Sequence, residues 1–165
     1  MIIAADYYKK YIDNVKNVSL TEALNFSKSY LEKTLAEVPI ERYDYAYAEG
    51  KWTIKQVLLH LIDTERVMAY RALRIGRGDQ TPLPGFDQDA FMKTIDASKK
   101  SFDKLVQEYE AQRASSILLF SSFTQADLDR VGTASNKEVS CEALGYIIAG
   151  HDIHHCEVIN EKYLL

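Results

Sequence analysis

Three of the chain's four histidines stand close together in Gly150-His151-Asp152-Ile153-His154-His155-Cys156-Glu157, near the end of the 165 residues. Imidazole nitrogens bind divalent metals and also exchange protons near neutral pH, so this segment is the first place to look for chemistry. Two histidines four residues apart on a helix lie one turn apart on the same face, where they can hold one ion between them. His151 and His155 have this spacing.

A helix expected from Ser140 to about Lys162 would place His151 and His155 in the middle of an apolar stripe. At about 100° per residue, the side chains around His151 on that face are apolar: Leu144, Ile147, Ile148 and Val158. His154 falls on the edge of the stripe, at the rim of any site or behind a ligand. Asp152 lies on the other side and is a candidate to accept a proton from water.

A metal held by this pair needs a third ligand, and the remaining histidine, His60, is the candidate. A helix expected from Thr53 to about Ile75 places His60 on an inward-facing row with Val57, Thr64 and Val67. Three histidine ligands leave positions open for water or substrate, as in catalytic sites. Imidazole suits Zn²⁺, Ni²⁺, Cu²⁺ or Fe²⁺; we expect Zn²⁺ or Ni²⁺, with Fe²⁺ or Mn²⁺ as alternatives. The competing interpretation is a set of hydrogen-bonded core histidines.

Two other metal motifs are excluded. The segment from His151 to His155 has the H-E-x-x-H spacing of zinc proteases with Asp in place of Glu, but only ten residues follow in which a third ligand could occur. Di-iron bundles use paired Glu-x-x-His motifs, and the sequence contains none.

Two charged residues are further candidates for the site. Arg113 lies at the centre of the apolar stripe of a helix expected over residues 98–120, where a charge is costly unless it is paired. It could bind a substrate carboxylate or form a structural ion pair with a core carboxylate. Asp63, three residues after His60, could orient an imidazole, pair with a cation or take a proton. Arg71 and Arg74 are expected to face solvent or the following linker.

The elements that must position these residues are four long helices. Capping boxes open the first at Ser19 and the second at Thr53, and Pro39 ends the first. Short helices are expected over residues 86–92 and after Thr124, whereas no segment alternates like a strand. The linker of residues 76–97 is long enough to run back along the second helix, so the second and third helices should be parallel. We therefore predict one all-α domain over residues 1–165, a four-helix bundle with a long crossover between helices two and three.

Composition narrows the classes of partner. The net charge of −4 and the absence of a basic cluster argue against nucleic acid. No apolar run approaches the length of a membrane helix, and no signal peptide is evident. Cys141 and Cys156 share one helix too far apart to bridge, so we expect reduced thiols and a cytoplasmic protein. Tyr7, Tyr8 and Tyr11 could cover a pocket or a dimer surface.

Several of these segments together resemble the DinB/YfiT-like family. They are Gly50-Lys51-Trp52-Thr53-Ile54-Lys55-Gln56 leading to His60, Asp63-Thr64-Glu65-Arg66, Leu83-Pro84-Gly85-Phe86-Asp87, Arg113, and His151-Asp152 followed by His154-His155. The resemblance covers nearly the whole chain in order. It implies a four-helix bundle with the predicted crossover, and a metal triad of His60, His151 and His155.

The resemblance implies a range of activities rather than one reaction. Family members include S-transferases that use low-molecular-weight thiols such as bacillithiol, mycothiol-dependent isomerases, and proteins labelled metal-dependent hydrolases. We therefore predict a metal-dependent enzyme that joins a small thiol to an electrophile. A hydrolase and a non-catalytic metal-binding bundle are the alternatives. Homodimers are common for this fold, but no interface can be assigned from the sequence.

Overall fold

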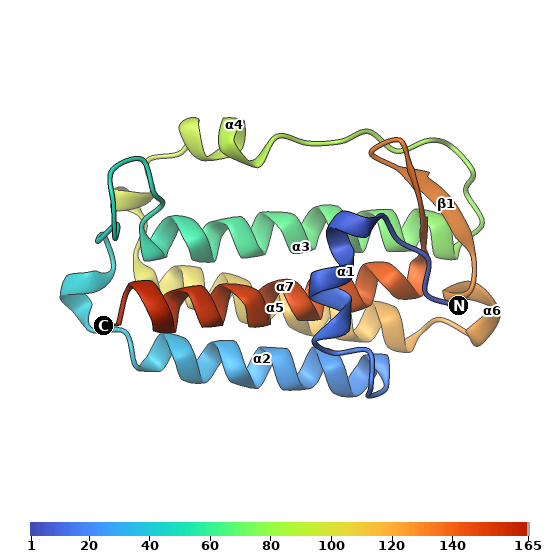
Figure 1. Ribbon diagram of the computed structural model, residues 1–165, viewed down its shortest axis with the longest axis horizontal. Coiled ribbons are helices and arrows are strands. Elements are labelled where there is room, and N and C mark those ends of the chain that lie inside the picture. Colours follow the sequence, from blue (N-terminus) through green and yellow to red (C-terminus); the bar gives the residue numbers. More distant parts are fainter. Residues whose placement is uncertain (165) are drawn as a thin grey trace.

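The computed structural model describes residues 1–164 and has at its centre a bundle of four long helices (Figure 1). These are α2 (Leu20–Ala36), α3 (Ile54–Gly76), α5 (Phe102–Ser121) and α7 (Cys141–Lys162). Helix α7 packs against α2 and α3, and α5 packs against the same two helices. The all-α bundle predicted from the sequence is therefore confirmed.

The ends of the long helices follow from local hydrogen bonding. The side chain of Ser19 accepts from the Glu22 amide and that of Thr53 from the Gln56 amide, and both form complete capping boxes. Ser140 caps α7 by accepting from the Ala143 amide. Each cap satisfies amide groups that the first turn of a helix leaves unpaired.

The crossover between α3 and α5 has the predicted direction. The Lys55 ammonium near the start of α3 donates to the Ser98 carbonyl just before α5, and further along Glu65 pairs with Arg113. The two helices therefore run parallel. Between them the chain returns along the outside of α3 (Figure 1), through α4 (Gln88–Lys93) and a 3-10 turn at Ala97–Lys99. A second 3-10 turn, Ile40–Arg42, follows α2, and α6 (Gln125–Leu128) follows α5.

Two elements were not predicted. A short helix, α1 (Asp6–Asp13), lies across α7, which it contacts. An antiparallel hairpin of β1 (Val131–Ala134) and β2 (Lys137–Ser140) precedes α7, so the expectation of no strands was wrong. The hairpin turns at Ser135 and Asn136, whose φ angles of 52° and 60° lie in the left-handed region typical of tight hairpin turns.

The apolar core is divided into two clusters, one toward each end of the bundle. One contains residues such as Met68, Phe120 and Leu144, and the other contains residues such as Leu58, Leu105 and Ile159. Near the boundary of the two clusters, every long helix carries buried polar side chains: Ser27, His60, Thr64, Glu65, Arg113, His151 and Asp152. This polar layer is where the candidate chemistry lies.

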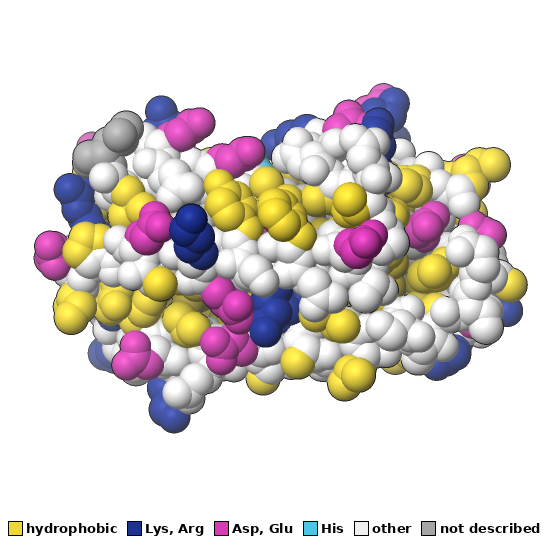
Figure 2. All heavy atoms as spheres, turned by 90° about the horizontal axis from the view of Figure 1, so that it is seen from below, with side chains coloured by type: hydrophobic (Ala, Val, Ile, Leu, Met, Phe, Trp, Pro, Cys, Tyr) yellow, Lys and Arg dark blue, Asp and Glu magenta, His cyan; other side chains and the backbone are white. Residues whose placement is uncertain are grey.

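The face of the molecule shown in Figure 2 carries acidic and basic side chains interspersed with apolar groups, rather than a field of one sign. Among the described residues, no helix is both long and apolar enough to cross a membrane.

Candidate metal centre

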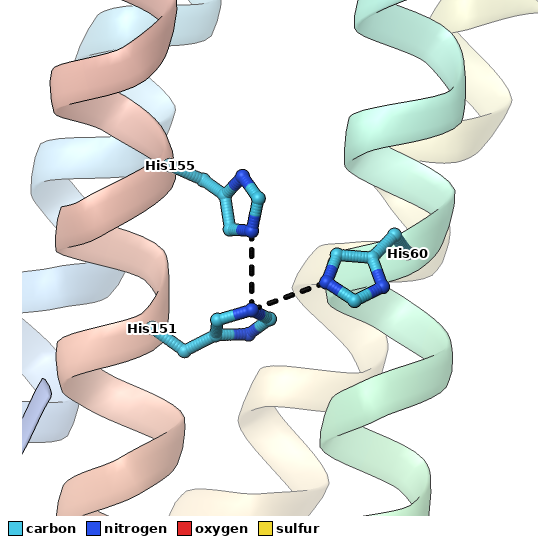
Figure 3. Close-up of side chains that lie close together, drawn as sticks. All are labelled: His60, His151 and His155. Carbon is cyan, nitrogen blue, oxygen red and sulfur yellow. Dashed lines mark hydrogen bonds between the residues drawn. The ribbon is translucent and has the colours of Figure 1, made fainter. Parts of the chain in front are cut away.

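His60 of α3 and His151 and His155 of α7 point toward one another across the gap between these two helices (Figure 3). The helices are antiparallel, since the Tyr163 hydroxyl at the end of α7 donates to the Trp52 carbonyl just before α3. The Nε2 atom of His151 lies 3.1 Å from Nε2 of His60 and 3.1 Å from Nε2 of His155. One ligand nitrogen from each ring lies within 4.8 Å of the other two.

These three imidazoles cannot satisfy one another by hydrogen bonding alone. The single Nε2 of His151 faces two other ring nitrogens, yet a neutral ring nitrogen offers either one proton or one lone pair. A divalent cation resolves this conflict, because three lone pairs can point at it. Metal–nitrogen bonds of 2.0–2.1 Å at tetrahedral angles separate the nitrogens by about 3.3 Å, close to the two short contacts observed. The residues therefore fit a divalent metal, whose identity the geometry does not choose.

Burial keeps the three imidazoles neutral, which is the form a metal binds. It lowers the pKa of His60 to about 4 and, with smaller contributions from neighbouring histidines, that of His155 to about 3. The pKa of His151 is lowered well below its ordinary value, mainly by burial and then by the charges of His155 and His60. No proton has to be displaced for these ligands to bind a metal at neutral pH.

Neighbouring side chains brace the rings. Thr64, one turn after His60 on α3, lies with its Oγ1 3.3 Å from His60 Nδ1, so its hydroxyl can fix which nitrogen of that ring is free for a metal. The rings of Trp52 and Tyr11 lie 4.8 Å from His60 and 5.3 Å from His151, measured between centroids. The roles of Thr64 and Trp52 were missed from the sequence, although Thr64 has the helical spacing that would have indicated it.

His154 and His155 differ in what surrounds them. The ring of His154 is half-buried and packs against Tyr11 and His155, at centroid distances of 5.5 and 5.3 Å, so it lies beside the triad as expected. In His155, Nδ1 is buried and has no hydrogen-bond partner among residues 1–164.

Arg113 and Asp152 form a closed network within the polar layer. Arg113 is fully buried; it makes a two-point ion pair with Glu65 at 2.9 Å and a further pair with Asp152 at 2.7 Å. The Tyr109 hydroxyl also donates to Asp152, at 2.6 Å, and Ser27 accepts from Arg113 at 2.8 Å. Burial raises the pKa of Asp152 to about 6, and the Arg113 charge opposes this. This geometry favours the structural ion pair over substrate binding by Arg113, and it occupies the Asp152 carboxylate.

Asp63 lies apart from the triad. It pairs loosely with Arg66, at 3.5 Å, and burial is the main cause of its raised pKa. It lines none of the pockets that reach the histidines. Its predicted part in catalysis, like those of Arg113 and Asp152, stays a prediction.

Neither cysteine offers a nucleophile of the protein's own. Cys141 and Cys156 are both free and completely buried. Burial raises the pKa of each thiol to about 12. Because the thiolate is the reactive form, both are inert near neutral pH.

Two pockets of about 240 Å³ each reach the triad from different sides. The first, here the tryptophan pocket, is bordered by Trp52, Lys51, Asp89, Tyr163 and His155. The second, the tyrosine pocket, is bordered by Tyr8, Tyr11, Phe86, Ser135 and His151. The pockets share no lining residue. Of the two uses expected for the tyrosines near the start of the chain, Tyr7, Tyr8 and Tyr11 line a pocket.

The protein is a four-helix bundle in which three histidines converge between two of the helices. Comparison with known proteins shows which family has these features. The pattern of the DinB superfamily matches residues 23–159, and the chain belongs to that superfamily.

Individual relatives agree with this placement. A protein from Oceanobacillus iheyensis named "Putative metal-dependent hydrolase" is 26% identical over 127 residues, covering 76% of this chain and 72% of that protein. The fold matches YfiT from Bacillus subtilis, a structure described as "a probable metal-dependent hydrolase with an unusual four-helix bundle topology". The TM-score is 0.75 at 18% identity, over 96% of this chain and 87% of that one. It also matches a mycothiol-dependent maleylpyruvate isomerase, with a TM-score of 0.67 at 16% identity, over 87% of this chain and 61% of that one.

Proposed function

We propose that this protein is a metal-dependent transferase that joins a low-molecular-weight thiol to an electrophilic small molecule. The observation that carries the proposal is the pair of separate pockets that meet at the triad, one at His151 and the other at His155. A reaction between two organic molecules needs two binding places beside the reactive centre. A hydrolase needs one, since its second reactant is water.

His60, His151 and His155 would hold a divalent metal, which lowers the pKa of a thiol so that it reacts as a thiolate. The three neutral imidazoles add no charge of their own to the centre. In the overall reaction the thiol sulfur forms a bond to the electrophilic carbon, the leaving group departs with its electron pair, and the thiol proton goes to solvent.

The arrangement of acids also favours transfer over hydrolysis. The buried carboxylates nearest the triad in sequence, Glu65 and Asp152, are engaged by Arg113 and Tyr109. Both carboxylates already pair with these groups, whereas thiol activation by a metal needs no such base. The name of the mycothiol-dependent fold relative is in keeping with a thiol substrate. Two buried, unbridged cysteines suit a reducing compartment, and the cytoplasm is part of this proposal.

The test begins with metal content. Protein loaded with Zn²⁺ or Ni²⁺ should retain about one ion per chain after gel filtration, measured by elemental mass spectrometry, and a His60→Ala/His151→Ala variant should retain none. His154→Ala, which changes a histidine outside the triad, is the matched control and should keep the ion.

Loaded protein is then incubated with cysteine, coenzyme A or bacillithiol and an aryl chloride, and the thioether is measured by chromatography. Metal-dependent thioether formation supports the transferase. Cleavage of nitrophenyl esters without added thiol would replace the proposal by the hydrolase alternative. Stoichiometric metal with neither reaction would leave a metal-binding bundle.

A further inference from the structure

A second buried arginine, Arg71 of α3, lies in surroundings unlike those of Arg113. Its exposed fraction is 2%, yet no carboxylate among residues 1–164 lies within 4.0 Å of its guanidinium. Its hydrogen bonds go to neutral groups, the Pro84 carbonyl at 2.7 Å and the Ser135 hydroxyl at 3.0 Å, with the Met68 sulfur 3.7 Å away. Of the two surroundings expected for Arg71, solvent and the linker, the structure shows the linker, since Pro84 and Phe86 belong to it.

The missing counter-ion is unusual within this chain. The other buried cations each have an acidic partner, Lys55 with Asp44 at 2.8 Å and Arg113 with two carboxylates. A buried charge is costly unless an opposite charge or several hydrogen bonds compensate it. Neutral contacts compensate the Arg71 charge only in part, so an anion from outside the chain could pair with it.

The contacts of Arg71 place it behind the wall of the tyrosine pocket. Met68, Ser135 and Phe86, whose ring centroid lies 5.6 Å from the guanidinium carbon, all border that pocket. Tyr8, another wall residue, borders a small cavity together with Arg71, and burial raises the pKa of its phenol while the Arg71 charge opposes this. His151 borders the same pocket. One cavity therefore extends from the triad to the neighbourhood of the uncompensated cation.

The crossover and the hairpin hold Ser135 in place between Arg71 and the cavity. The Leu83 amide donates to the Thr133 carbonyl at 2.9 Å, and the Ser135 amide donates to the Leu83 carbonyl at 3.0 Å. The Ser135 hydroxyl accepts from Arg71, and since a hydroxyl carries one proton, its own hydrogen remains available to donate into the pocket.

We propose that the tyrosine pocket binds a carboxylate-bearing thiol, with the carboxylate at the Ser135 end and the sulfur at the triad. Ser135 contacts the carboxylate, and Arg71 is a positioning residue that supplies the positive charge through the Ser135 hydroxyl. His60 and Arg71 are eleven residues apart on α3, about 16 Å along the helix. The pocket borders α3 at Thr64 and Met68, which lie between these two residues, so the bound molecule spans less than this, on the order of 10 Å. This inference deepens the proposed function and rests on it.

The experiment uses Co²⁺-loaded protein, whose visible absorption reports a sulfur ligand. The probes are ω-mercaptoalkanoic acids from two to ten carbons, each compared with the ω-mercaptoalcohol of the same length. At the chain length that spans the pocket, the acid should bind at least about tenfold more tightly than the alcohol. The preference should fall to about twofold or less in Arg71→Met and in Ser135→Gly, and part of it should survive in Arg71→Lys.

The variants are chosen so that misfolding does not obscure the result. Ser135 has φ of 52°, a conformation that glycine adopts readily, so Ser135→Gly removes the hydroxyl without straining the turn. Arg74→Met is the matched control, because Arg74 follows Arg71 by one turn, is partly exposed and pairs with Asp79. It should keep the full preference. If Arg71→Met does not fold, Ser135→Gly and Arg71→Lys carry the test.

A parallel series of ω-carboxy and ω-hydroxy hydroxamic acids, which bind metals without a thiol, separates the two proposals. A carboxylate preference among hydroxamates with no binding of thiols would refute thiol transfer and support the anion site. Equal binding of acids and alcohols at every length, or a preference unchanged in both Arg71→Met and Ser135→Gly, overturns the anion site. If neither series binds the loaded protein, both proposals fall.

Discussion

Arg113 and Arg71 are both buried in the bundle, but the groups that surround their positive charges differ. Arg113 meets two carboxylates, a serine hydroxyl and the Leu24 carbonyl, and its network is complete within the fold. Arg71 meets only neutral groups at the edge of a cavity. The contrast teaches that a buried charge can pair within the fold or remain available to pair with a ligand. The presence of a carboxylate partner distinguishes the two cases.

The largest effect expected from this contrast is on the stability of an Arg113→Met variant. Removal of the guanidinium leaves Glu65 and Asp152 buried without a cation, which should lower the free energy of unfolding by about 3–5 kcal/mol. Urea denaturation followed by circular dichroism measures this. Adding Glu65→Gln and Asp152→Asn should recover much of the loss. A loss below about 1 kcal/mol in the single variant would show that the network is not what holds the polar layer together.

The three histidines are a third case, because they are buried polar side chains without a charge. Their effect should be visible in how the free energy of unfolding depends on pH. In metal-free protein, the lowered pKa of His60, about 4 against an ordinary 6.5, means that the folded state binds fewer protons than the unfolded state in this range. Stability is therefore full above pH 6.5 and falls as the pH drops toward 4, by about 1.4 kcal/mol per pH unit for this histidine.

The matched comparison for this pH effect is His60→Gln. Asp152, whose raised pKa acts in the opposite direction, is common to both proteins and cancels. Chemical denaturation at several pH values between 4 and 7 should show a shallower acid decline in the variant. Identical declines would mean that His60 is not buried as a neutral ring.

A smaller effect, on the affinity for a metal, is expected from the Thr64 hydroxyl, a neutral group that only orients the His60 ring. Thr64→Val keeps the shape of the side chain but removes the hydroxyl beside His60 Nδ1. Affinity for Zn²⁺ should fall about tenfold, as is usual when a partner of a ligating histidine is lost. Competition with a chromophoric chelator measures the affinity, and Thr64→Ser, which retains the hydroxyl, should stay close to the wild type.

The smallest effect is expected for the stability of the ligand-free Arg71→Met variant. This variant tests the contrast between Arg71 and Arg113 most directly. The substitution leaves no buried carboxylate behind, so the loss of its hydrogen bonds and the relief of an uncompensated charge should nearly cancel. The free energy of unfolding should change by no more than about 1 kcal/mol. A loss as large as that of Arg113→Met would show that Arg71 is as structural as Arg113.

The sequence predicted the bundle and the histidines well because helical periodicity carries that information. Capping boxes marked Ser19 and Thr53 as helix starts, and the apolar stripe of α7 already contained His151 and His155. The interruption of the α5 stripe by Arg113 likewise signalled a buried charge. Such features are local, so one stretch of chain is enough to show them.

The burial of Arg71, the hairpin and the short helix α1 were not predicted, because they depend on contacts between segments distant in the sequence. Arg71 is buried by the crossover and the hairpin, which cover a side of α3 that the bundle itself would leave open. The strands β1 and β2 have four residues each, too few for an alternation to stand out, and their turn uses Ser135 and Asn136 without a glycine. Helix α1 has only eight residues and is held by its packing on α7.

That packing has a consequence for how the tyrosine pocket could change over evolution. At Gly150, directly before His151, a β-carbon would lie 1.9 Å from the Tyr11 carbonyl oxygen, so α1 rests on bare backbone there. Any larger residue at position 150 would push α1 outward and, with it, the tyrosines that wall the cavity. A single substitution at a residue with no functional group could therefore widen the range of accepted substrates while every metal ligand stays in place.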